Sequence, residues 1–173
     1  MFRKVVVAAL AVAAALAPVV LAVVPRPLPD IAIPMPGGKR VRVQQYKGKV
    51  VTVVLFSTTC KSCIASLELL GKAQKQFAPR GFQAVAAAVN ADAPGEIKGF
   101  VDRYRPAFPT GHLGQADLVK FADIKPTDRP FVPIFLFIDR HSTVRFQYNG
   151  DDPVMREQEK ATMAIIDSLL KTN

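Results

Sequence analysis

The most informative segment of the sequence is Val-Val-Thr-Val-Val-Leu-Phe-Ser-Thr-Thr-Cys-Lys-Ser-Cys, residues 50–63. Its first half, Val50–Phe56, is an almost continuous β-branched and apolar run, which is typical of a strand buried on both faces. A helical pattern follows from Cys60 to about Ala78 and is closed by Pro79 and Gly81. Its apolar positions have the spacing of one buried helix face: Cys63, Ile64, Leu67, Leu70 and Phe77. The only two cysteines of the chain therefore lie at a strand–helix junction.

A pair of cysteines three positions apart at a helix start is arranged for thiol chemistry. The helix N-terminus offers unpaired backbone N–H groups and the positive end of the helix dipole, and both stabilise a thiolate. Thiols in this position have pKa values of roughly 3.5–7.5 instead of about 8.5. We expect Cys60, at the cap, to be the attacking thiol and Cys63, on the core-facing side, to resolve the mixed disulfide. Lys61 adds a positive charge and is expected to tune the acidity of Cys60.

Two structural interpretations of the cysteines stay open at this point. Free cysteines are often simply buried core residues. Half of a zinc site is the other interpretation, but structural zinc needs four ligands, usually with a second pair three to five residues apart. The remaining soft ligands, His112 and His141, are far from each other in sequence. We therefore expect no metal and no other cofactor.

The N-terminus has the pattern of a membrane-targeting leader. Arg3 and Lys4 precede an uncharged run, Val5–Val24, which at about 1.5 Å per residue spans roughly the 30 Å hydrocarbon core of a bilayer. The length favours a signal anchor in residues 1–24, although Val20-Leu21-Ala22 also fits a cleavage site. The basic residues predict a cytoplasmic N-terminus and a domain on the outer side, in the periplasm. Residues 25–29 are predicted to form a Pro-rich spacer before a single domain, residues 30–173.

Composition limits the functional classes. The 173-residue chain carries a formal net charge of +9 and 50% hydrophobic residues, so it can build one core. The charge favours acidic partners or anionic membrane surfaces, or is a solvated basic surface. No nucleic-acid motif is present. An extracytoplasmic domain without further cysteines uses no structural disulfide, so the C-x-x-C is predicted to be chemical.

The order of elements predicts an α/β fold with a mixed central sheet, helices on both faces and an extra N-terminal hairpin. The first strand–helix–strand unit requires a right-handed parallel crossover, and the later hairpin adds antiparallel strands. The expected strands are 39–45, 50–56, 82–89, 134–138 and 143–148. The expected helices are 60–78, 94–104, 116–122 and a last one that opens at Asp151-Asp152-Pro153 and runs to 171.

The sequence resembles the thioredoxin fold, and specifically the membrane-tethered TlpA/ResA-like thiol–disulfide oxidoreductases, over about residues 30–171. Two segments carry the resemblance, IPMPGGKRVRVQQYKGKVVTVVLFSTTCKSC and VPIFLFIDRHSTVRF. It implies a cis-proline at Pro133 beside the active-site disulfide, with Val132 and Pro133 as the edge that binds the substrate. It also implies a monomer whose partners are client protein thiols and disulfides and an upstream redox protein.

Several positions depart from that family pattern. Thr59 stands where the family usually has tryptophan before the first cysteine, and Ser66 stands where TlpA-like proteins often have glutamate, with Glu68 nearby. The strand 50–56 lacks the buried acid of many thioredoxins. These differences affect the proton-transfer partner and the redox potential, and leave the two-cysteine chemistry in place.

Two other functions share related folds. A peroxiredoxin-like thiol peroxidase fits Ser57-x-x-Cys60 with Arg129 as its arginine, but has Val53 where that family has proline. A Sco-like copper chaperone uses C-x-x-x-C and a histidine just before the later strand, whereas His141 falls in the expected hairpin.

Overall fold

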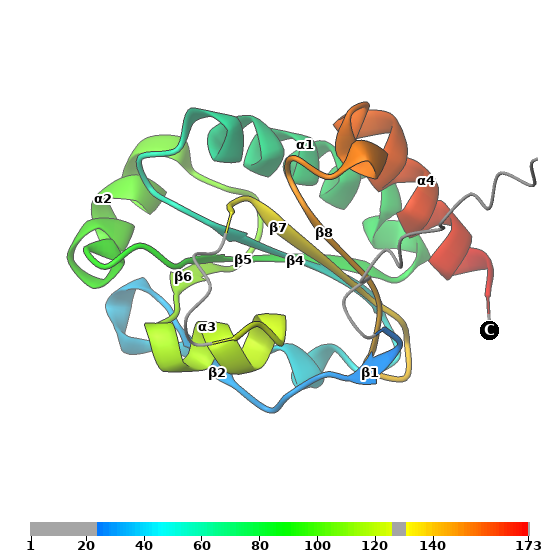
Figure 1. Cartoon of the computed structure of the whole chain (residues 1–173), viewed down its shortest axis with the longest axis horizontal. Helices are drawn as coiled ribbons and strands as arrows, with labels where there is room; N and C mark the ends of the chain where they lie inside the picture. The colour runs from blue at the N-terminus through cyan, green and yellow to red at the C-terminus, as the bar shows by residue number, and fades with distance from the viewer. Residues whose placement is uncertain (1–23, 126–130, 173) are drawn as a thin grey trace, which may run out of the picture.

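The structure, a computed structural model, describes residues 24–125 and 131–172 (Figure 1). The predicted leader, residues 1–24, lies outside the described residues except for Val24. Arg129, the arginine of the peroxidase alternative, also lies outside them. Within the described ranges, no helix combines the length and the apolar character needed to cross a bilayer.

Two sheets, four α-helices and four short 3-10 turns make up the regular structure of the described residues. The strands are β1 (Arg26–Pro27), β2 (Ala32–Pro34), β3 (Arg40–Arg42), β4 (Val50–Phe56), β5 (Phe82–Ala88), β6 (Thr110–His112), β7 (Ile134–Ile138) and β8 (Thr143–Asn149). The helices are α1 (Lys61–Phe77), α2 (Ala93–Tyr104), α3 (Gln115–Ala122) and α4 (Gln158–Lys171).

The central sheet is mixed, as predicted from the sequence. Its strand order is β1-β8-β7-β4-β5-β6, with β4, β5 and β6 parallel and with β7 antiparallel to β4 and β8. Strands β2 and β3 pair separately as the expected N-terminal hairpin. Strand β4 lies between β5 and β7, so its residues are paired on both edges and the C-x-x-C loop leaves from the middle of the sheet.

The sheet separates two apolar cores. Figure 1 shows α1 and α4 above the sheet and α3 below it. In β4, Val50, Val54 and Phe56 pack on the side of α1 and α4, while the alternate positions pack toward α3 and the N-terminal hairpin. All seven residues of β4 are buried, which explains why its sequence is a continuous run rather than an alternation.

The Pro-rich segment expected to be a spacer contributes to the sheet. Arg26 and Pro27 of β1 pair with Val144 and Thr143 at the edge of β8. The Arg26 side chain is 12% exposed, and its guanidinium donates hydrogen bonds to Phe121 O (3.0 Å) and Gln147 Oε1 (2.7 Å). This long-range clamp holds the segment that follows the leader against α3 and β8.

Two predicted element bounds were wrong. The strand expected at 39–45 ends at Arg42, because the chain then forms a 3-10 turn, Val43–Tyr46, that buries Val43. The last helix does not begin after Asp152, as predicted. The Asp152 side chain accepts a hydrogen bond from Val154 N and caps only a 3-10 turn, Pro153–Met155. Glu157 has a non-helical backbone, and α4 begins at Gln158.

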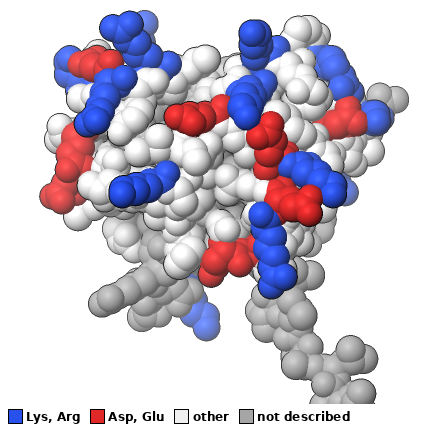
Figure 2. Space-filling view, turned by 90° about the horizontal axis from the view of Figure 1, so that it is seen from above, with Lys and Arg blue, Asp and Glu red and all other residues white. Residues whose placement is uncertain are grey.

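Charged residues of both signs are interspersed on the face seen from above in Figure 2. Several charged residues of the protein are paired, including Lys72 of α1 with Glu159 of α4 (3.0 Å) and Arg80 with Asp167 of α4 (2.7 Å). Pairs at the surface contribute little stability each, about 0–1 kcal/mol. They show that part of the positive charge is locally compensated.

Candidate active site

Helix α1 begins at the cysteine pair. Cys60 is the N-cap, with an extended backbone, and its Sγ accepts a hydrogen bond from Cys63 N at 3.2 Å. Cys60 O in turn accepts from Ile64 N at 3.2 Å. The first sulfur therefore satisfies one of the backbone donors that a helix N-terminus leaves free, in the position where an anion is stabilised.

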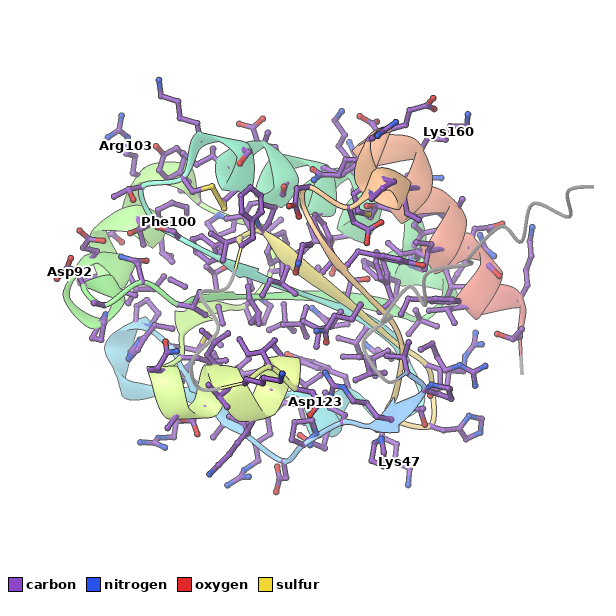
Figure 3. The ribbon with its side chains drawn as sticks, in the orientation of Figure 1. Lys47, Asp92, Phe100, Arg103, Asp123 and Lys160 are labelled. Atoms are coloured by element: carbon purple, nitrogen blue, oxygen red, sulfur yellow. A yellow bond between two sulfur atoms is a disulfide. The ribbon has the colours of Figure 1, made fainter. Side chains whose placement is uncertain are left out.

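The two cysteines form a disulfide, with their Cα atoms 5.2 Å apart. Figure 3 shows it as the yellow bond near the start of α1. Cys63 is fully buried, whereas Cys60 is partly exposed. This difference in access is the one predicted from the helix pattern, and it supports the order of attack proposed below.

A hydroxyl adds a second polar contact to Cys60. Ser62 Oγ lies 3.2 Å from Cys60 Sγ. The Ser62 hydroxyl and the Cys63 N–H are thus two donors to the Cys60 sulfur, and both hydrogen bonds become stronger when that sulfur is negatively charged. The side chain of Lys61, by contrast, is exposed at the first position of α1, and no hydrogen bond or ion pair joins it to the described residues. Its predicted tuning role therefore stays a prediction.

Val132 and Pro133 lie just before β7. The Val132–Pro133 peptide bond is cis, as the resemblance implied. Pro133 is buried, and Val132 packs against the same apolar core as Cys60 and Cys63. Their role as the edge that binds a substrate stays a prediction.

Gly150 is a site residue that the sequence analysis missed. Its N–H donates to Pro133 O at 2.7 Å. A Cβ on Gly150 would lie 2.7 Å from Pro133 Cδ and 2.9 Å from its Cγ, so a larger residue does not fit without a shift. The only sequence signal was the Asn-Gly pair at 149–150, which reads as an ordinary turn.

A polar network, also missed, holds the loop between β4 and α1. Thr58 N donates to Asn90 Oδ1 at 3.1 Å, and Asn90 Nδ2 donates to Glu96 Oε2 at 3.1 Å. The Thr58 hydroxyl bonds to the same Glu96 carboxylate. The network ties the residues before Cys60 to the first turn of α2.

Ser66, where TlpA-like proteins often have a glutamate, forms an uncharged hydrogen-bonded pair with Gln158. Ser66 is buried, and its Oγ lies 2.9 Å from both Ser62 O and Gln158 Oε1, two acceptors for its single proton. Glu68 points to the exposed surface of α1 instead. The position one turn beyond Cys63 therefore carries a hydroxyl in place of a carboxylate.

The histidines of the zinc and copper alternatives lie apart. His112 ends β6, and His141 is exposed in the turn between β7 and β8. In the described part of the chain no group of three His, Cys, Asp or Glu side chains is placed to hold a metal ion. Ser57, the serine of the peroxidase alternative, has its hydroxyl 3.2 Å from the Thr59 hydroxyl.

A parallel β4–β5 unit, an antiparallel β7–β8 hairpin, a C-x-x-C at the start of α1 and a cis-proline before β7 together define the thioredoxin-like class. Within that class the chain belongs to the Redoxin family, whose model matches residues 24–165.

Curated relatives support the same grouping. The thiol-disulfide oxidoreductases ResA of Bacillus thuringiensis subsp. konkukian and of Bacillus cereus are each 24% identical over 115 residues, which cover 66% of this chain and 62% of theirs. The chain thus aligns with less than two thirds of the length of these relatives.

Solved structures show the fold. A DsbE-like putative thiol:disulfide interchange protein from Chlorobium tepidum superposes with a TM-score of 0.71 at 23% identity, covering 84% of this chain and 96% of that one. The thioredoxin domain of a Bacteroides vulgatus thiol-disulfide oxidoreductase gives 0.66 at 16% identity, with coverage of 84% and 96%. The thioredoxin-like fold and the TlpA/ResA-like resemblance predicted from the sequence are confirmed.

Proposed function

We propose that this protein is a thiol–disulfide oxidoreductase that exchanges disulfides with client proteins through Cys60 and Cys63. The observation that carries the proposal is the disulfide at the start of α1, with its first sulfur accessible and hydrogen-bonded to a helix N–H and its second sulfur buried. The names of the ResA relatives agree with this activity.

Exchange proceeds in two sulfur-transfer steps. The Cys60 thiolate attacks a client disulfide, one client sulfur leaves as a thiolate that takes up a proton, and a mixed disulfide forms. Cys63 then gives up its proton and attacks Cys60 Sγ, which releases the second client thiolate and forms the Cys60–Cys63 disulfide. Two electrons pass from the protein to the client, and an upstream redox protein restores the dithiol. The reverse sequence oxidises a client dithiol.

The geometry assigns the two roles. The N–H of Cys63 and the hydroxyl of Ser62 stabilise negative charge on Cys60, whereas the fully buried Cys63 sulfur cannot meet a client directly. Val132 and Pro133 are proposed as the edge along which an extended client backbone pairs.

We also propose that residues 1–24 tether the domain to a membrane with the site on the outer side, and that the folded domain works as a monomer. The charge and hydropathy pattern of the N-terminus supports the tether. Cell fractionation tests it: recovery of a soluble form that begins near Val23 would show a cleaved signal peptide instead.

A trapping experiment tests the activity. Cys63→Ser, reduced and mixed with an insulin-type disulfide substrate, is expected to accumulate a mixed disulfide at Cys60, whereas Cys60→Ser forms none. Mass spectrometry of the non-reduced complex identifies the bonded cysteine. Turnover of the substrate by Cys63→Ser at the parent rate would contradict the two-cysteine mechanism and favour one-cysteine chemistry such as a peroxidase.

A further inference from the structure

A groove of about 430 Å³ runs between α1 and α2, directly beyond the cysteine pair. It starts at Ile64, one helical turn after Cys60, and continues along α1 to Lys75. The opposite wall comes from α2 and the segment after it. The larger apolar residues that line it are Ile64, Leu67, Phe100, Tyr104, Pro106 and Phe108. We call it the α1–α2 groove; it shares no residue with the Val132–Pro133 edge.

An exposed aromatic ring connects the α1–α2 groove to the active-site loop. Tyr104 is 40% exposed, yet its ring is fixed by Phe100 (centroids 4.6 Å apart) and by the Arg103 guanidinium 5.4 Å from the ring centre. Tyr104 and Phe100 also line a neighbouring hollow of about 240 Å³, together with Thr58 and Thr59. Figure 3 shows Phe100 and Arg103 on α2, at the end of the molecule where α1 begins. The two hollows share Phe100 and Tyr104, so the surface beside the residues before Cys60 leads into the groove.

The charges of the α1–α2 groove are partly uncompensated. Lys75 and Arg105 both line it, and neither side chain forms an ion pair or a hydrogen bond with the residues that the structure describes. Lys72, one turn before, is by contrast bonded to Glu159. The single acid of the lining is Glu68. Two free cations beside an apolar surface complement a ligand that carries apolar groups and carboxylates.

We propose that the α1–α2 groove binds an extended, apolar and acidic segment of the client polypeptide, adjacent to the client cysteine that bonds to Cys60. This inference rests on the proposed exchange activity and adds the class of client to it. The helical rise of about 1.5 Å per residue places Ile64 about 6 Å and Lys75 about 22 Å along α1 from Cys60. An extended chain advances about 3.3 Å per residue, so the apolar part begins about two residues from the client cysteine and the carboxylates lie about seven residues away.

Three synthetic peptides test the proposal, each with one cysteine activated as a mixed disulfide with thionitrobenzoate. In the acidic peptide, two glycines, three leucines, one glycine and two glutamates follow the cysteine. The basic peptide has lysines in place of the glutamates, and the short peptide ends after the two glycines. Attack by reduced protein releases coloured thionitrobenzoate, and Cys63 then releases the peptide thiol. For the parent protein, kcat/KM for the acidic peptide is expected to exceed that for the short peptide by about tenfold, the effect of about 1.4 kcal/mol of binding.

The ratio of kcat/KM for the acidic peptide to kcat/KM for the short peptide is measured for each variant, so that a general loss of activity cancels. Tyr104→Ala is expected to bring the ratio close to one through a higher KM for the acidic peptide. Val154→Ala, an exposed apolar residue outside the groove, keeps the parent ratio. Lys75→Gln is expected to lower the ratio about threefold, whereas Lys72→Gln, whose cation is already paired, keeps it.

The outcomes separate the two proposals. Reaction with all peptides at equal kcat/KM, unchanged in Tyr104→Ala, overturns the α1–α2 groove as a client site and leaves the exchange activity intact. Equal values for the acidic and basic peptides also overturn it, because apolar contact alone would then explain the binding. Failure of the parent protein to release thionitrobenzoate from the short peptide overturns the exchange activity itself.

Discussion

A methyl group added at Gly150 is expected to displace Pro133 and to slow disulfide exchange. In Gly150→Ala the new Cβ would lie 2.7 Å from Pro133 Cδ and 2.9 Å from Cγ. Carbon atoms normally approach to about 3.5 Å, so the two segments must separate by about 0.8 Å. Neither the Pro133 segment nor the Gly150 segment can move easily. The proline ring is rigid and buried, and a 2.7 Å hydrogen bond from Gly150 N to Pro133 O joins the two backbones.

The magnitude follows from that displacement. Overpacking of this kind costs about 1–3 kcal/mol of folding free energy. A shift approaching 1 Å at a reacting site costs up to about a hundredfold in rate, so we expect exchange to slow by at least about tenfold. Urea unfolding gives the first quantity, and reduction of an insulin-type substrate gives the second.

Gly95→Ala is the matched control. Gly95 lies in α2, and a Cβ there meets nothing within 4 Å. The substitution is expected to stabilise the helix by roughly 0.5–1 kcal/mol and to leave exchange unchanged. If Gly150→Ala matched the control in both unfolding free energy and exchange rate, the contact with Pro133 would not position the site.

Three further substitutions test the packing and the electrostatics. Thr52→Val removes a buried hydroxyl that has no hydrogen-bond partner among the described residues, so urea unfolding should show a gain of about 1 kcal/mol; a loss of that size would reveal a missed partner. Arg26→Met removes the bond to Phe121 O and should lower the unfolding free energy by about 1–3 kcal/mol; an unchanged value would show that the β1 clamp is unimportant. The pKa of Asp167 is lowered from its ordinary value of 3.8, first by the hydrogen bond from Lys171, so its stabilising effect is present above that value and is lost as pH falls through the folded-state pKa. Asp167→Asn should therefore be less stable than the parent at neutral pH, and the difference should shrink as the pH falls through the folded-state pKa; a difference independent of pH would contradict this.

The elements that could be predicted from the sequence are those with local signals. The apolar run of β4 and the helical stripe after Cys60 placed the cysteine pair at the start of α1, because burial on both faces and on one helix face leaves distinct patterns. The β7–β8 hairpin followed from two short apolar runs around a turn. The burial of Cys63 was likewise predicted from the helical spacing of the apolar residues alone.

The missed features depend on contacts between distant segments. Gly150 meets Pro133 only because β8 pairs with β7 in one register, and no pattern within residues 149–153 specifies that contact. Thr58 is likewise 32 residues from Asn90 and 38 from Glu96. The strand β1 could not be expected, because its partner in β8 is more than a hundred residues away and three prolines suggested a spacer. Local propensity carries no information on such pairings.

The order in which the two thiols react tests whether the start of α1 activates Cys60. The fully reduced protein is alkylated with iodoacetamide over a range of pH, and mass spectrometry measures the modified fraction of Cys60 and Cys63 separately. We expect Cys60 to react first, with an apparent pKa below the value of about 8.5 for free cysteine, and Cys63 to react only slowly. Preferential labelling of Cys63, or equal rates for both cysteines with an apparent pKa near 8.5, would contradict the claim that the start of α1 activates Cys60 as the nucleophile.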